Sequence, residues 1–102
     1  MAKLLVMYHT PADPAAFDRY YKGTHMVLAK KLPGLQSYKI SKGPIASPGG
    51  PSPYHLIAEL TFDSMGALQA ALGSPEGQAA VADLANFASA GVTISMYEMQ
   101  DA

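Results

Sequence analysis

The stretch YHLIAELTF, residues 54–62, decides the fold class because its side chains alternate in character as those of a β-strand do. One face is apolar throughout and carries Leu56, Ala58, Leu60 and Phe62. The other face is mixed and carries His55, Ile57, Glu59 and Thr61. A strand with one fully apolar face indicates a sheet that packs against a hydrophobic layer on that side.

Three further strands are predicted outside this stretch. Residues 2–9 (AKLLVMYH) are largely apolar on both faces, which is typical of a central strand that is covered on both sides. Residues 35–42 alternate weakly and suit a partly exposed strand, and residues 92–99 form the last strand. Residues 43–53 (GPIASPGGPSP) are rich in Gly, Pro and Ser, so we expect a mobile loop at the tip of a hairpin.

Helical segments separate these strands. The dipeptide Asp13-Pro14 is typical of a helix start. We expect this helix over residues 14–22, with an end or a kink at Gly23 and a continuation over residues 25–31. Serine N-caps predict two more helices, over residues 65–72 and 74–87.

The order β-α-β-β-α-β predicts an α+β, ferredoxin-like domain, in which a four-stranded antiparallel sheet carries helices on one face. With 102 residues the chain has room for one domain, residues 1–102. The other face of the sheet carries Ile57 and alternate residues of the first and last strands, which makes it too apolar to face water. We therefore expect a homodimer in which two such faces pack together, and whether dimers assemble further is left open.

Composition excludes several classes of function. The net charge is −1 and no basic stripe is present, so nucleic acid is not an expected partner. The chain has no cysteine, which removes disulfides, thiolate metal sites and cysteine nucleophiles. The apolar run near the N-terminus is too short to span a membrane and lacks a cleavage site, so we expect no membrane partner and a cytoplasmic location.

Two segments resemble the EthD family. The first, AAFDRYYKGTHMVLAKKLPGLQSYKI (residues 15–40), has a Tyr-Tyr pair, a histidine four residues after it and a Pro-Gly-Leu turn. The second covers residues 57–88 and includes a Phe-Asp-Ser strand end and a Ser-Pro-Glu-Gly helix start. The resemblance implies a dimeric α/β barrel made of two ferredoxin-like halves. It also implies kinship with cofactor-free monooxygenases, haem-degrading enzymes and lactone isomerases, but it does not define a reaction.

His25 is the predicted catalytic residue. It follows Tyr21 by four positions, so both would share a face of a continuous helix and line a cleft between helix and sheet. The alternative role is a structural histidine that anchors a helix end. The aromatic residues could line an apolar pocket or simply fill the core: Phe17, Tyr20, Tyr21, Tyr38, Phe87 and Tyr97.

Tyr21, Phe87 and Tyr97 are the predicted pocket walls, and Asp83 completes the predicted substrate-binding set. A solvent-facing carboxylate is the more usual role for a helical residue such as Asp83, whereas an inward position would let it orient His25 or bind a hydroxyl.

The chain gives little sign of a metal or cofactor. His9 and His55 are expected on or near the dimer face, far from His25 in sequence and without carboxylates at ligand spacing, so no metal site is predicted. No Gly-rich phosphate loop and no Gly-x-Ser-x-Gly motif is present, and we expect no cofactor. Haem binding with His25 as axial ligand stays open as a minor alternative.

The leading functional hypothesis is a catabolic enzyme of oxidoreductase type (similar to cofactor-free monooxygenases), or an isomerase or lyase, that acts on a small hydrophobic compound. The alternative is a non-catalytic accessory protein that binds a hydrophobic metabolite or supports a partner oxygenase. An enclosed pocket with His25 opening into it would favour the enzyme, and a cleft filled by side chains would favour the accessory protein.

Overall fold

Strand β1 (Ala2–His9) lies in the middle of a four-stranded antiparallel sheet with the order β2-β5-β1-β6. Its neighbours are β5 (Tyr54–Phe62) and β6 (Val92–Glu98), and β2 (Ser37–Ile40) is the edge strand beside β5. The computed structural model describes all 102 residues. The α+β class and the ferredoxin-like order are confirmed, although β2 is shorter than the expected segment 35–42.

The first helical unit passes through Gly23 without ending. Helix α1 (Pro14–Tyr20) begins with the Asp13 side chain accepting a hydrogen bond from the amide of Ala16. A π-helical turn, η1 (Tyr21–His25), follows, and α2 (Met26–Ala29) continues from it. The amide of Met26 donates to the carbonyl of Tyr21, five residues earlier, so the expected end or kink at Gly23 is instead a widened turn.

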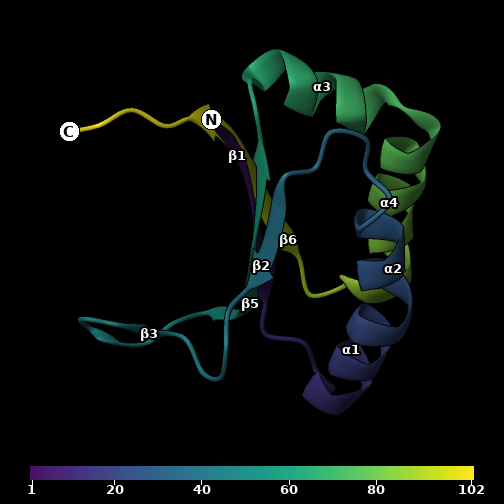
Figure 1. Ribbon diagram of the computed structural model, residues 1–102. Helices are drawn as coiled ribbons and strands as arrows, with labels where there is room; N and C mark the ends of the chain where they lie inside the picture. The colour runs from purple at the N-terminus through teal and green to yellow at the C-terminus, as the bar shows by residue number, and fades with distance from the viewer.

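The second helical unit consists of α3 (Met65–Gly73) and α4 (Pro75–Phe87). Ser64 and Ser74 cap these helices through their hydroxyl groups, as the sequence predicts. Both helical units cover the same face of the sheet (Figure 1). The core lies between these two layers, and its large, fully buried side chains are Tyr8, Tyr21, Phe62 and Leu68.

The opposite face of the sheet has no helix on it (Figure 1). Leu5, Met7 and Ile57 are half-buried there although no other element of the chain covers them. Two short strands, β3 (Ala46–Ser47) and β4 (Gly50–Pro51), form a hairpin that projects on this side of the sheet. The segment 43–53 is thus the outer part of the connection from β2 to β5, as expected, and it has strand pairing of its own.

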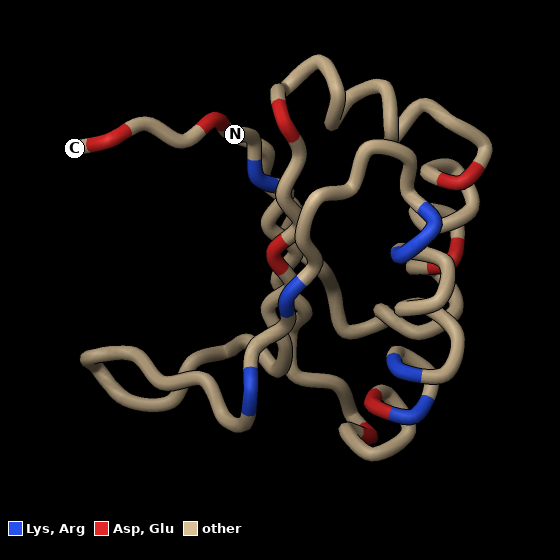
Figure 2. The backbone as a smooth tube through the Cα atoms, in the orientation of Figure 1, with Lys and Arg blue, Asp and Glu red and all other residues tan.

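Positive and negative residues are interspersed along the backbone (Figure 2). Only one ion pair joins a Lys to an acid, between Lys3 of β1 and Glu59 of β5, at 3.1 Å.

None of the helices has both the length and the apolar character needed to cross a membrane.

The junction of α3 and α4 requires a glycine at position 77. A Cβ atom there would lie 2.1 Å from the carbonyl oxygen of Ala71 and 2.6 Å from the Cα atom of Leu72. Both are backbone atoms, so relief requires the two helices to move apart. We expect Gly77→Ala to lower the free energy of unfolding, measured with urea, by roughly 1–3 kcal/mol.

Gly23→Ala is the matched control, because it lies in a helical turn with no atom within 4 Å of an added Cβ. It is expected to leave stability unchanged or to raise it by up to roughly 1 kcal/mol. Equal stabilities for the two variants would contradict this description of the helix junction.

Candidate functional site

His25 and Asp83 form a buried pair between the two helical units. His25 is the last residue of η1 and Asp83 lies on α4, and each is only 6% exposed. The Nδ1 atom of His25 lies 3.0 Å from the Oδ2 atom of Asp83. Because a carboxylate only accepts hydrogen bonds, Nδ1 carries the proton of this bond.

The other oxygen of Asp83 is also fully engaged. The Tyr20 hydroxyl donates to Oδ1 at 2.6 Å, and the amide nitrogen of Asn86 donates to the same atom at 2.9 Å. Burial alone would raise the pKa of Asp83, but the hydrogen bonds from Tyr20, Asn86 and His25 outweigh it and hold the pKa below its ordinary value. Asp83 is therefore an ionised carboxylate at neutral pH.

His25 is neutral at neutral pH. Burial lowers the pKa of His25 below its ordinary value and outweighs the opposite effect of Asp83. With the proton on Nδ1, the Nε2 atom keeps its lone pair and acts as an acceptor. The only polar atom near Nε2 is the Tyr8 hydroxyl, at the long distance of 3.4 Å.

His25 opens into a cavity between the sheet and the helices. The cavity has a volume of about 90 Å³, and most of its wall consists of aliphatic side chains such as Leu4, Val6 and Leu84. Its polar groups come from His25 and from three tyrosines, Tyr8, Tyr21 and Tyr38. A mostly apolar cavity with a few convergent polar groups is the usual form of a small-molecule site.

The three tyrosines of the cavity keep their protons. The hydroxyl groups of Tyr21 and Tyr38 share a short hydrogen bond. Burial raises the pKa of Tyr8, Tyr21 and Tyr38, and the neighbouring Tyr38 raises the pKa of the other two further. The cavity therefore presents neutral hydroxyl groups beside a neutral imidazole.

The structure brings together most of the residues predicted from the sequence. Tyr21 and His25 lie side by side, with ring centroids 5.5 Å apart. The Phe87 ring packs on His25 with a centroid distance of 4.7 Å, but Phe87 is not part of the cavity wall, so its predicted role as a wall residue is wrong. Asp83 faces inward and contacts His25, so the solvent-facing role that its position favours is wrong. The burial is possible because three donors satisfy its carboxylate.

Tyr97 is not brought to the site. It pairs with Lys3 in the β1–β6 register and so shares the helix-free face, whereas Tyr8, Val6 and Leu4 point toward the helices. Tyr8 belongs to the site but was not predicted as a site residue. Its place in the alternation with Leu4 and Val6 is the signal that would have found it.

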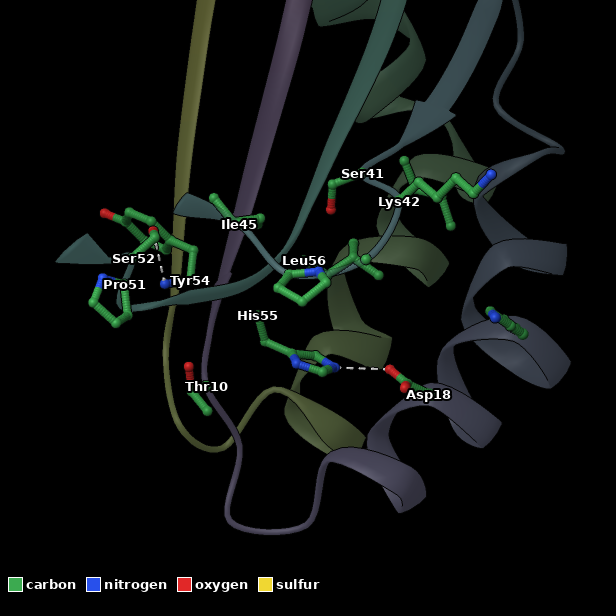
Figure 3. Close-up of a pocket in the computed structure, with 14 residues that line it drawn as sticks. Thr10, Asp18, Ser41, Lys42, Ile45, Pro51, Ser52, Tyr54, His55 and Leu56 are labelled. Carbon is green, nitrogen blue, oxygen red and sulfur yellow. Dashed lines mark hydrogen bonds and ion pairs between the residues drawn. The ribbon is translucent and has the colours of Figure 1, made fainter. Parts of the chain in front are cut away.

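A larger hollow of about 670 Å³ lies at the base of the hairpin (Figure 3). It contains a second His–Asp pair, in which Nε2 of His55 lies 2.8 Å from Oδ1 of Asp18. Its lysines, Lys22 and Lys42, are exposed, and it does not include His25. We therefore take the smaller, more apolar cavity as the candidate functional site.

His55 corrects an expectation. It was expected on or near the dimer face, but it reaches α1 because it is the extra residue of a β-bulge opposite Tyr8 and His9. The bulge lets His55 point to the helix side, where its ring meets that of Phe17 at 5.2 Å.

The cavity does not fit a haem group. A volume of about 90 Å³ is far too small for the macrocycle, and the Tyr8 hydroxyl occupies the space in front of Nε2 where an iron would stand. No three His, Asp or Glu side chains lie close enough together to hold a metal ion.

Comparison with known proteins decides the family. The EthD domain model matches residues 9–91 of the chain. This chain belongs to the EthD family. It is 43% identical over 94 residues to an uncharacterised 11.0 kDa protein from the thcB-thcC intergenic region of Rhodococcus erythropolis, covering 92% of this chain and 90% of that protein. An EthD family protein of Bacillus halodurans superposes with a TM-score of 0.89 at 36% identity, covering 98% of this chain and 99% of that one.

More distant structures share the fold of this EthD protein. SnoaB, a cofactor-independent oxygenase of Streptomyces nogalater, has a TM-score of 0.68 at 13% identity, and the match covers 99% of this chain and 94% of SnoaB. A dimeric ferredoxin-like protein of unknown function from Thermobifida fusca has a TM-score of 0.70 at 14% identity, and the match covers 96% of this chain and 90% of that one. At these identities the likeness shows the fold alone.

Proposed function

We propose that this EthD protein is a catabolic enzyme that removes a proton from a small hydrophobic compound, with Nε2 of His25 as the base. The reaction class is oxidoreductase of the cofactor-free monooxygenase type, or isomerase or lyase. One observation carries the proposal: a neutral histidine, held by a buried carboxylate, lines an apolar cavity, and its unprotonated Nε2 has only the distant Tyr8 hydroxyl beside it.

Each part of the pair has a separate role in this chemistry. His25 takes a proton from a carbon of the substrate, and the imidazolium that forms is stabilised by the adjacent Asp83 carboxylate. Asp83 is a positioning residue, because it holds the Nδ1–H tautomer and does not line the cavity. The aliphatic wall excludes water and so protects the carbanion from reprotonation by solvent.

The carbanion has two outcomes. In an isomerase or lyase it is reprotonated at another atom or expels a leaving group. In a monooxygenase it gives electrons to dioxygen, the oxidant; the substrate then loses two hydrogen atoms and gains one oxygen atom, and the other oxygen atom leaves as water. The fold shared with the oxygenase SnoaB supports the second outcome by analogy only.

The accessory role remains the competing proposal. A protein that only binds a hydrophobic metabolite needs an apolar cavity but has no use for a neutral imidazole with a fixed tautomer. The pair of His25 and Asp83 at the cavity therefore favours the enzyme.

We also propose that the protein is a homodimer formed through the helix-free face of the sheet. Leu5, Met7, Ile57 and Tyr97 lie on this face, and no other part of the chain covers them. The hairpin projects beside the same face and limits what can approach it (Figure 1). The dimeric ferredoxin-like protein of Thermobifida fusca, which has the same fold, supports this assignment.

Replacing His25 tests the catalytic proposal. Substrates are first sought among carbonyl and aromatic metabolites that raise the melting temperature of the protein. His25→Asn, whose amide can still donate to Asp83, is expected to lower kcat by roughly 10²–10⁴-fold while the circular dichroism spectrum stays unchanged. Asp83→Asn should lower kcat as well, because an amide at that position no longer fixes the tautomer.

The matched control is His55→Asn, which removes the histidine of the second His–Asp pair, outside the cavity. It is expected to keep the activity of the unchanged protein. Compounds that bind but are never converted would contradict the enzyme and support the accessory role. An equal fall in kcat in His25→Asn and His55→Asn would show that the effect is not specific to the cavity.

A charge on the helix-free face tests the dimer. The proposed interface is expected to bury on the order of 1,200–2,000 Å², so the unchanged protein should sediment as a dimer at micromolar concentration. Ile57→Asp should give a folded monomer, because it places a carboxylate in the middle of the interface. Val27→Asp, at a residue that is 49% exposed on α2, should remain dimeric. A stable monomer for the unchanged protein would refute the assignment.

A further inference from the structure

The hydroxyl groups of Tyr21 and Tyr38 leave one proton without an acceptor. Each hydroxyl has one proton to donate, and a single hydrogen bond joins the two groups. Whichever tyrosine donates in that bond, the proton of the other has no partner in the protein. Tyr21 is only 1% exposed and Tyr38 is half-buried, and both residues line the cavity, so this proton is available to a ligand there.

No other group of the cavity wall makes a hydrogen bond with this proton. Both oxygens of Asp83 are engaged by Tyr20, Asn86 and His25, and Asp83 does not line the cavity. The lone pair on Nε2 of His25 faces the hydroxyl of Tyr8. A ligand that brings an acceptor oxygen to the Tyr21–Tyr38 pair therefore gains a hydrogen bond that an apolar ligand lacks.

The cavity also restricts the charge of that ligand. Its lining has no Lys or Arg, so a permanent carboxylate or phosphate would be buried without a counter-charge. A neutral ligand whose oxygen becomes negative only during the reaction avoids this cost. Such an oxygen gains most from a donor that is already aimed at it.

We infer that the Tyr21–Tyr38 hydroxyl pair binds the oxygen of the substrate and stabilises its developing negative charge, so that the substrate is a small enolisable ketone or a phenol. The inference rests on the proposed function in taking Nε2 of His25 as the base. In the ketone, the C–H bond next to the carbonyl breaks, its proton goes to Nε2, and the electron pair moves to the carbonyl oxygen. In a phenol, the O–H bond breaks, its proton goes to Nε2, and the charge is shared between the phenolate oxygen and the ring carbons, which then have the carbanion character that the proposed function requires.

This assignment gives the three cavity tyrosines different tasks. Tyr21 and Tyr38 form the donor for the substrate oxygen, and their raised pKa values keep them protonated when the substrate becomes an anion. Tyr8 lies at the base itself, with its hydroxyl 3.4 Å from Nε2, where it restrains the imidazole ring.

Phenol and toluene test the inference, because they have nearly the same shape and differ by the hydroxyl that the pair would bind. The dissociation constant of each is measured by titration calorimetry. In the double variant Tyr21→Phe/Tyr38→Phe, the preference for phenol over toluene is expected to fall by about tenfold, the equivalent of one hydrogen bond. Toluene affinity should stay the same, because both partners of the bond are removed together and no buried group is left unpaired.

Tyr54→Phe is the matched control, since Tyr54 packs against His9 outside the cavity. It should keep the full preference for phenol. The inference is overturned if the double variant keeps the preference within about twofold, if it loses phenol and toluene affinity equally, or if neither compound binds the unchanged protein.

The outcome is separable from that of the proposed function. A phenol preference that depends on the tyrosine pair, in a protein that converts no substrate, would support this inference and refute the catalytic role of His25. Turnover that depends on His25 but is unaffected by the double variant would support the catalytic role of His25 and refute this inference.

Discussion

The hydrogen bond between Nδ1 of His25 and Asp83 is the constraint on which the site depends. It joins the turn η1 to helix α4, two segments of the helical layer that the chain brings together from distant positions. Burying the Asp83 carboxylate without donors would be costly, and His25 supplies one of the three hydrogen bonds that satisfy it. The same bond fixes the tautomer of His25 and thereby leaves Nε2 unprotonated.

The π-helical turn connects this bond to the rest of the cavity. It begins at Tyr21 and ends at His25, and both of these residues are buried. From this one turn, Tyr21 reaches Tyr38 on β2 while His25 reaches Asp83 on α4. A substrate between them would meet a hydrogen-bond donor at one residue and a base at the other. Widened turns of this kind occur often at functional sites.

Sequence patterns predicted the fold well where a local signal exists. The alternation of β1 and β5 and the serine caps of α3 and α4 all appear in the structure. The pairing of Tyr21 with His25 followed from their spacing. The inward position of Asp83 could not be predicted, because its burial depends on Tyr20 and His25, more than fifty residues earlier. The positions of Tyr97 and His55 depend on strand register and a bulge, which composition does not encode.

The state of the His25 ring tests the central claim most directly. Nitrogen-15 NMR of the imidazole, assigned by its loss in His25→Asn, reports which nitrogen carries a proton. The account predicts a proton on Nδ1 and none on Nε2 at pH 7. It also predicts a second protonation only below the ordinary histidine value of about 6.5, since burial lowers the pKa of His25. A proton on Nε2, or on both nitrogens at pH 7, would contradict the account.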